Sequence, residues 1–163
     1  MKWLAVNVSI FLFIFCSTSI VFSQEKLDEG FAGTKFGQNP PKNFKKIPQV
    51  DPSSPGDKVK SVLYESPKSA TPDLFGIPVK NAYFKYCKNK LVEITITTIK
   101  VEREKSFKTF YENFGSPSGE EKPNSFTKAH LFIWELPNST IQYSIAGDNT
   151  SAAIITSKND YCK

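Results

Sequence analysis

Two stretches near the middle of the chain alternate apolar and polar residues with a period of two. Residues 82–86 read Ala-Tyr-Phe-Lys-Tyr, and residues 91–99 read Leu-Val-Glu-Ile-Thr-Ile-Thr-Thr-Ile. This period is typical of half-buried strands, so the pattern predicts a β-hairpin. A two-residue turn at 88–89 would place Phe84 opposite Glu93. We therefore favour a three-residue turn at 88–90, which gives one wholly apolar face and pairs Tyr86 with Val92, Phe84 with Ile94 and Ala82 with Ile96.

A helical period follows this hairpin. Four aromatic residues recur at intervals of three and four, which places them on one stripe of a helix. They are Phe107, Phe110, Tyr111 and Phe114. The pattern predicts a helix over 103–114 that stops at Gly115, with Pro117 preventing continuation. We expect all four rings to be buried against the 82–99 hairpin, each contributing about 2 kcal/mol. An exposed aromatic binding strip is the alternative.

The last third of the chain predicts a three-strand meander. Apolar or alternating runs occupy 131–136, 140–145 and 151–157. Pro137 and Asn138 are good turn formers. A two-residue turn there places Trp134 opposite Ile141 and Phe132 opposite Tyr143. Shorter runs at 31–37 and 59–65 predict two further strands.

Proline and glycine interrupt these elements, and the longest interruption is 38–57. We expect an exposed loop there, held by anchors such as Phe44 and Ile47. Its lysines give it local positive charge. A solvated loop is the simpler interpretation. The functional alternative is a docking loop for an anionic surface or partner, formed by Lys42, Phe44, Lys45 and Lys46. Irregular connections are also expected at 66–79 and 116–125.

The N-terminus predicts export. A short basic start, Met1-Lys2, precedes an almost unbroken apolar run that ends near Phe22. Val21 and Ser23 fit the small-residue pattern of a cleavage site, so 1–23 is predicted to be a signal peptide cleaved before Gln24. The alternative is an uncut membrane anchor. Cleavage leaves 24–163 as a single domain with no stable membrane span, in the periplasm or secreted.

The cysteines agree with that compartment. Cys16 would leave with the signal peptide, so Cys87 and Cys162 remain. Two cysteines in an exported chain most simply form one disulfide. This bond would tie the turn of the 82–99 hairpin to the C-terminus, closing a 76-residue loop worth about 4 kcal/mol in the chain-entropy model.

The sequence carries little that predicts chemistry. Its single histidine, His130, lacks a neighbouring base and orienting group in the sequence. No zinc, calcium or phosphate-loop spacing occurs, so we expect no metal and no cofactor. The formal net charge is +5, but Arg103 is the only arginine. A nucleic-acid site would need a basic face with arginine and stacking aromatics, so we expect none.

The helix and the meander together resemble small exported α+β modules of bacterial envelopes. The resemblance rests on Phe107-x-x-Phe110-Tyr111-x-x-Phe114-Gly115-Ser116-Pro117 and on the meander around Trp134. BamE-like lipoproteins and the β-lactamase-inhibitor-protein family are the examples that it is similar to. It implies a protein-binding module and not an enzyme. The lipidated cysteine and the helix pair of BamE are absent, so it does not imply membrane anchoring. The signal end and the Lys/Asn/Phe-rich composition resemble an envelope protein of a Bacteroidetes-like bacterium.

These patterns predict one α+β domain, with an antiparallel sheet of about six or seven strands covered on one face by one helix. The predicted function is non-catalytic binding of another envelope or secreted protein, through the loop side of the sheet. One alternative is a small-molecule carrier, whose aromatic faces would enclose a cavity. The other is a secreted enzyme, which would need polar groups that converge in a cleft, such as His130 with Glu135 or Asp148.

Overall fold

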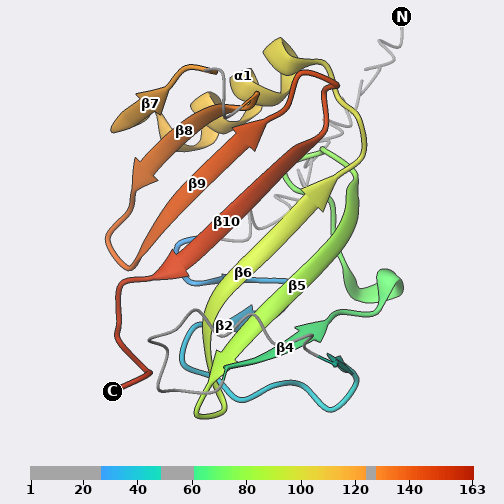
Figure 1. Ribbon diagram of the computed structural model, residues 1–163. Helices are drawn as coiled ribbons and strands as arrows, with labels where there is room; N and C mark the ends of the chain where they lie inside the picture. The colour runs from blue at the N-terminus through green and yellow to red at the C-terminus, as the bar shows by residue number, and fades with distance from the viewer. Residues whose placement is uncertain (1–26, 49–60, 124–127) are drawn as a thin grey trace, which may run out of the picture.

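Eight antiparallel strands form the main sheet of the computed structural model, in the order β3-β4-β5-β6-β10-β9-β8-β7 (Figure 1). The structure describes residues 27–48, 61–123 and 128–163. Its elements are β1 (Gly30–Phe31), β2 (Thr34–Lys35), β3 (Lys45–Ile47), β4 (Ser61–Glu65), the 3-10 helix η1 (Lys68–Ala70), β5 (Val79–Cys87), β6 (Lys90–Thr98), α1 (Arg103–Phe114), β7 (Gly119–Glu121), β8 (His130–Glu135), β9 (Ser139–Ile145) and β10 (Ser151–Ser157). The predicted signal peptide and residues 49–57 of the predicted loop lie outside the described residues.

The fold is predominantly β with one helix, consistent with the predicted α+β class. The expected six or seven strands are too few, because β3 and β7 add one strand at each end of the sheet. Each has only three residues, two of them adjacent charges, so neither shows the alternation that predicts a strand. The strand predicted at 31–37 is instead the small β1–β2 hairpin, which forms a separate two-stranded sheet.

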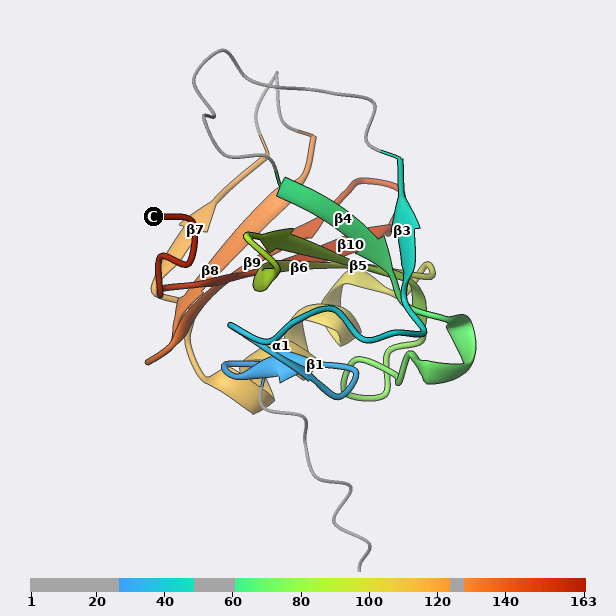
Figure 2. The same cartoon turned by 90° about the horizontal axis from the view of Figure 1, so that it is seen from below.

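One face of the main sheet is covered and the other is not covered by a described helix or strand. Helix α1 and the β1–β2 hairpin lie on the same side of the sheet (Figure 2). We call this side the inner face and the opposite side the outer face. Alternate strand residues point inward and form the core with apolar residues from the covering segments. The largest fully buried side chains are Trp134, Tyr86, Tyr143, Phe31, Phe84, Phe110, Leu27, Leu74, Ile77, Leu91, Ile94 and Ile96.

The β5–β6 hairpin has a two-residue turn, so the three-residue turn predicted at 88–90 is wrong. Cys87 pairs with Lys90, and both turn residues have positive φ, 49° for Lys88 and 62° for Asn89. The predicted pairs of Phe84 with Ile94 and Ala82 with Ile96 are nevertheless confirmed, although Tyr86 pairs with Leu91 instead of Val92. A β-bulge at Val92 reconciles the two observations, because one extra residue in β6 restores the apolar face after the tighter turn.

The meander is confirmed in its register. Trp134 lies opposite Ile141 and Phe132 opposite Tyr143, as the two-residue turn predicts. Strand β10 then pairs with β9 on one side and with β6 on the other. It therefore joins the two hairpins into one sheet.

Helix α1 has the predicted bounds but a different partner. Its ring contacts with the sheet are to β8 and β9, not to the β5–β6 hairpin. Phe110 is fully buried and stacks on Tyr143, with ring centroids 3.9 Å apart, and its ring lies 5.6 Å from that of Trp134. Phe107 meets Phe132 at 4.5 Å. The insertion of β10 between β6 and β9 explains the error, because it separates the meander from the β5–β6 hairpin.

The aromatic stripe buries fewer rings than expected. Phe107 and Phe114 pack against the core, but Tyr111 remains 47% exposed. Gly115 ends the helix with φ of 74°, as its predicted role requires. Its carbonyl oxygen accepts a hydrogen bond of 2.9 Å from Nε1 of Trp134, so the helix end is attached to β8.

A chain of buried hydroxyl groups crosses the core between α1 and the sheet. Ser106 Oγ is hydrogen-bonded to the hydroxyl of Tyr143, which donates to Ser151 Oγ at 3.0 Å. Ser151 Oγ is in turn 2.6 Å from Thr98 Oγ1. All four side chains are buried, so each partner relieves the desolvation cost of the next.

Tyr86, in contrast, has a buried hydroxyl group without a hydrogen-bond partner among the described residues. Burial, with a smaller contribution from Tyr64, raises the pKa of Tyr86 to about 12. Burial also raises the pKa of Tyr143, although its bonds to Ser106 and Ser151 oppose the shift.

These two tyrosines make a matched test, since Tyr→Phe removes the same atom from each. We expect Tyr143→Phe to lower the free energy of unfolding by about 1–3 kcal/mol, because it leaves two buried serines with fewer partners. Tyr86→Phe should leave stability unchanged or raise it by up to about 1 kcal/mol, because it removes an unpaired buried hydroxyl. Urea denaturation of both variants measures the difference. Equal effects would contradict this account of the core.

The raised pKa of Tyr86 also predicts sensitivity to alkali. Above pH 10 the unfolded chain loses the Tyr86 proton, whereas the folded chain keeps it until about pH 12. The folded state then binds more protons, so stability falls as the pH rises, by roughly 2–3 kcal/mol from this group. Denaturation series at pH 9 to 12 should show a shallower decline in Tyr86→Phe than in the wild type. Parallel declines would refute the prediction.

Candidate functional site

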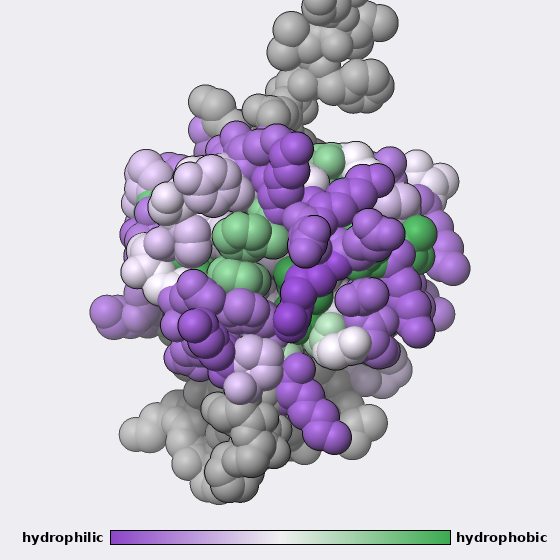
Figure 3. All heavy atoms as spheres, turned by 90° about the horizontal axis from the view of Figure 1, so that it is seen from above, coloured by the Kyte–Doolittle hydropathy of each residue, from purple (hydrophilic) through white to green (hydrophobic). Residues whose placement is uncertain are grey.

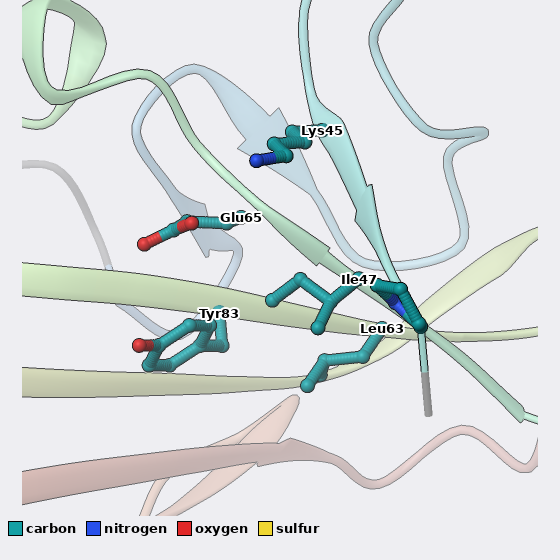
Figure 4. A pocket seen from close by; sticks show the side chains of 6 residues that line it. Lys45, Ile47, Leu63, Glu65 and Tyr83 are labelled. Atoms are coloured by element: carbon teal, nitrogen blue, oxygen red, sulfur yellow. The ribbon is translucent and has the colours of Figure 1, made fainter. Parts of the chain in front are cut away.

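A groove on the outer face, above strands β3 to β5, is the candidate site (Figure 4). It has a volume of about 370 Å³. The residues that line it are Lys45, Ile47, Pro48, Leu63, Glu65 and Tyr83. The polar ends of Lys45, Glu65 and Tyr83 point to the same side of the groove, and Ile47 and Leu63 lie next to each other.

Strand register explains why these side chains meet. Lys45 pairs with Glu65, which pairs with Tyr83, so these three residues form one row across the sheet. Ile47 and Leu63 form the next row on the same face. The residues next to these five along the strands point to the inner face. Phe84, the neighbour of Tyr83, is one of them and is fully buried. The alternation that builds the core therefore also places the half-exposed apolar side chains of Ile47 and Leu63 beside the row that holds Lys45 and Glu65.

The four residues predicted as a docking loop do not stay together. Phe44 is buried and its ring lies 4.8 Å from that of Phe84, so it is part of the core. Lys45 and Lys46 belong to strand β3 and not to a loop, and they point to opposite faces of the sheet. Lys42 is exposed outside any strand. Only Lys45 lines the groove.

Sequence patterns did not single out Leu63, Glu65 and Tyr83. All three lie in stretches predicted as strands, at positions that face away from the apolar side of the strand. The available signal was an apolar residue at an outward position, such as Leu63 between Val62 and Tyr64. Without the order of the strands, this signal does not reveal which outward residues are neighbours.

The predicted disulfide is confirmed. Cys87 and Cys162 are bonded, with their Cα atoms 5.4 Å apart. The bond joins the C-terminal segment to the end of β5, and Lys88 Nζ also donates to the main-chain oxygen of Lys163. A disulfide is compatible with an exported protein.

The residues considered for catalysis are engaged in separate contacts. His130 Nε2 lies 2.6 Å from Glu120 Oε1, and the imidazole stacks on Phe132. Glu135 is at the other end of β8, where bonds from Lys158 and Thr140 lower the pKa of its carboxyl. His130 and Glu135 are therefore not neighbours in one cleft.

Asp148, the other candidate partner of His130, stabilises the turn between β9 and β10. It accepts bonds from the main-chain nitrogen and the hydroxyl of Thr150, and these bonds lower the pKa of its carboxyl. The expected aromatic faces of a carrier also pack on each other, as the stack of Phe110 on Tyr143 illustrates.

The described residues contain no group of three or more His, Cys, Asp or Glu side chains that could hold a metal ion. No helix among them has the length and apolar character needed to cross a membrane. Seen from the end where α1 lies, the surface is mainly hydrophilic around small apolar areas (Figure 3).

No family model matches the chain, and no curated protein matches it. Among solved structures, it is similar to YjgB, a DUF4309 family protein from Bacillus subtilis, with 18% identity and a TM-score of 0.36. The match covers 48% of this chain and 57% of YjgB, so it spans little more than half of that protein. The resemblance to BamE-like and β-lactamase-inhibitor-like modules stays a prediction.

The disulfide provides a testable prediction of stability. Its cysteines are 75 positions apart, and a loop of this length is worth about 4 kcal/mol in the chain-entropy model. We expect Cys87→Ser/Cys162→Ser to lower the free energy of unfolding by about that amount, as measured in guanidinium chloride. Wild type reduced with dithiothreitol is the control and should match the variant. A variant that unfolds at the same denaturant concentration as the oxidised wild type would contradict the prediction.

Proposed function

We propose that this protein is an exported, non-catalytic binding module for another envelope or secreted protein, and that the groove above β3–β5 is its contact surface. The observation that carries the proposal is the half-exposed apolar floor formed by Ile47, Leu63 and Tyr83 on the outer face. Lys45 and Glu65 border it, so the groove combines an apolar centre with polar groups at its margin. This composition is typical of protein contact surfaces.

Outside this groove, the exposed large apolar side chains of the described residues come from separate segments. Ile99 follows β6 and Tyr111 lies on α1. Tyr83 supplies a ring with a polar tip, a type of side chain that is enriched at interfaces. Apolar side chains of a partner would be buried against Leu63. Lys45 and Glu65 would pair with charged groups of the partner and so fix the orientation in which it binds.

Site-specific photo-cross-linking tests this function. A photoreactive phenylalanine analogue replaces Tyr83 in the groove or, as a control, Tyr111 on α1, which is 47% exposed. Both proteins are produced in the native host and irradiated in whole cells. We expect a defined exported protein to be captured from position 83 and not from position 111.

The captured protein is then purified and its affinity is measured directly. Leu63→Asp should weaken its binding more than about tenfold, because a charge then occupies the apolar floor. Thr97→Asp is the matched control, since Thr97 also lies on the outer face, on β6, but does not line the groove. Equal capture from both positions, or equal affinity of both variants, would contradict the proposed surface.

A further inference from the structure

The two ends of the main sheet are formed by strands of equal length. β3 is the first strand in the sheet order and β7 is the last, and each has three residues. They lie at opposite sides of the sheet (Figure 2). Within the described residues, β3 pairs only with β4 and β7 only with β8. The outer edge of each therefore offers main-chain groups to which a further strand can bond.

The edges carry opposite charges. β3 contributes Lys45 and Lys46, and β7 contributes Glu120 and Glu121; all four residues are exposed. Charges on an edge strand oppose pairing with a like edge. Two β3 edges would bring lysines together, and two β7 edges would bring glutamates together. A β3 edge beside a β7 edge brings lysine to glutamate instead.

Strand direction allows that third pairing. Every neighbouring pair in the sheet is antiparallel, and the number of strands is eight. The first and last strands therefore run in opposite directions. A second copy in the same orientation would place its β7 antiparallel to β3, so the alternation of the sheet would continue across the boundary.

One register satisfies both charge pairs. If Lys45 lies opposite Glu121 of the second copy, Lys46 lies opposite its Glu120, because the positions run in opposite directions. The faces also agree. Lys46 and Glu120 belong to the inner face, since they pair with Tyr64 and Phe132 respectively. Lys45 and Glu121 both belong to the outer face. Glu120 already contacts His130 through Oε1, which leaves its second carboxylate oxygen for Lys46.

The third pair in this register is apolar. Ile47 would lie opposite Gly119 of the second copy. Gly119 pairs with Ile133, and a Cβ atom at Gly119 would lie 3.6 Å from the Ile133 side chain. The glycine therefore leaves the half-exposed Ile133 without a cross-strand side chain on the β7 side, whereas Gln142 lies opposite it on the β9 side. Ile47 of the neighbouring copy has the position and the apolar character to cover it.

We propose that the protein associates head to tail, with β3 of one copy pairing with β7 of the next. The contact surface is Lys45–Ile47 of one copy and Gly119–Glu121 of the other. Because the two surfaces differ, the contact does not close into a two-fold dimer and gives open chains or closed rings of copies. The short contact and its ion pairs predict association that is weak, concentration-dependent and sensitive to salt.

Analytical ultracentrifugation of the purified protein at pH 8 tests this proposal. We expect the weight-average mass to rise with protein concentration in about 0.05 M salt and to return to the monomer in about 1 M salt, where the Debye length is about 3 Å. Lys45→Glu/Lys46→Glu makes both edges acidic, and Glu120→Lys/Glu121→Lys makes both basic. Each variant alone should associate more than about tenfold more weakly than the wild type.

Mixing the two variants provides the decisive arm. In a 1:1 mixture every acidic edge meets a basic edge of the other variant, so association should return. Lys105→Glu/Lys108→Glu is the control for Lys45→Glu/Lys46→Glu, since it makes the same change in charge on exposed positions of α1 and should associate like the wild type. Circular dichroism checks that each variant is folded. A wild type that stays monomeric at low salt, a mixture that stays monomeric, or association that survives either charge swap would overturn the proposal.

Discussion

The stacking of Phe110 on Tyr143 is the contact on which the packing of α1 depends. Their ring centroids lie 3.9 Å apart, and both side chains are fully buried. The same tyrosine binds Ser106 of α1 and Ser151 of β10 through its hydroxyl. One residue of β9 therefore supplies an apolar contact and a polar contact to the helix. The apolar contact supplies burial, whereas the directional hydroxyl bonds favour one position of the helix on the sheet.

Segments without long regular structure cover the other half of the inner face. Leu27, Phe31, Leu74 and Ile77 are all buried there. Asp28 attaches this cover to the meander, because its carboxylate accepts bonds of 2.8 Å from both the main-chain and side-chain nitrogens of Asn138. Contacts distant in sequence thus hold together segments that could not form a core alone. The sheet itself depends on a distant contact of the same kind, because β10, the last strand in the sequence, joins the β5–β6 hairpin to the β8–β9 hairpin.

Sequence periodicity predicted those parts of the fold whose local pattern agrees with their tertiary environment. The long strands and α1 have such patterns, and the register of β8 with β9 follows from the turn at Pro137 and Asn138. The β5–β6 turn was predicted wrongly because the bulge at Val92 adds one residue to β6. The same apolar face therefore forms with a turn that is one residue shorter than predicted. Strands β3 and β7 could not be predicted, since three residues with two charges form strands only beside an existing sheet.

The residues of the candidate site could be predicted even less well from local sequence patterns. Lys45 was recognised as a charge, but its neighbours Glu65 and Tyr83 come from two other strands and become adjacent only through the register. Phe44 was assigned to the same surface because it is close in sequence, yet its ring packs at a tilt against that of Phe84 inside the core. A surface assembled across strands depends on strand order, which local patterns do not encode.

Lys45 belongs both to the groove and to the edge of the sheet, so the two proposed surfaces affect each other. A strand added beside β3 lies on the side away from β4, and Leu63 and Tyr83 lie on β4 and β5. The second copy therefore borders the groove and contacts Ile47 of its floor, but it leaves Leu63 and Tyr83 uncovered. In the register proposed above, Ile47 packs over Gly119 of that copy and reaches its Ile133. The apolar floor would then extend across the boundary, and a chain of copies would offer a partner a longer apolar strip than one copy does.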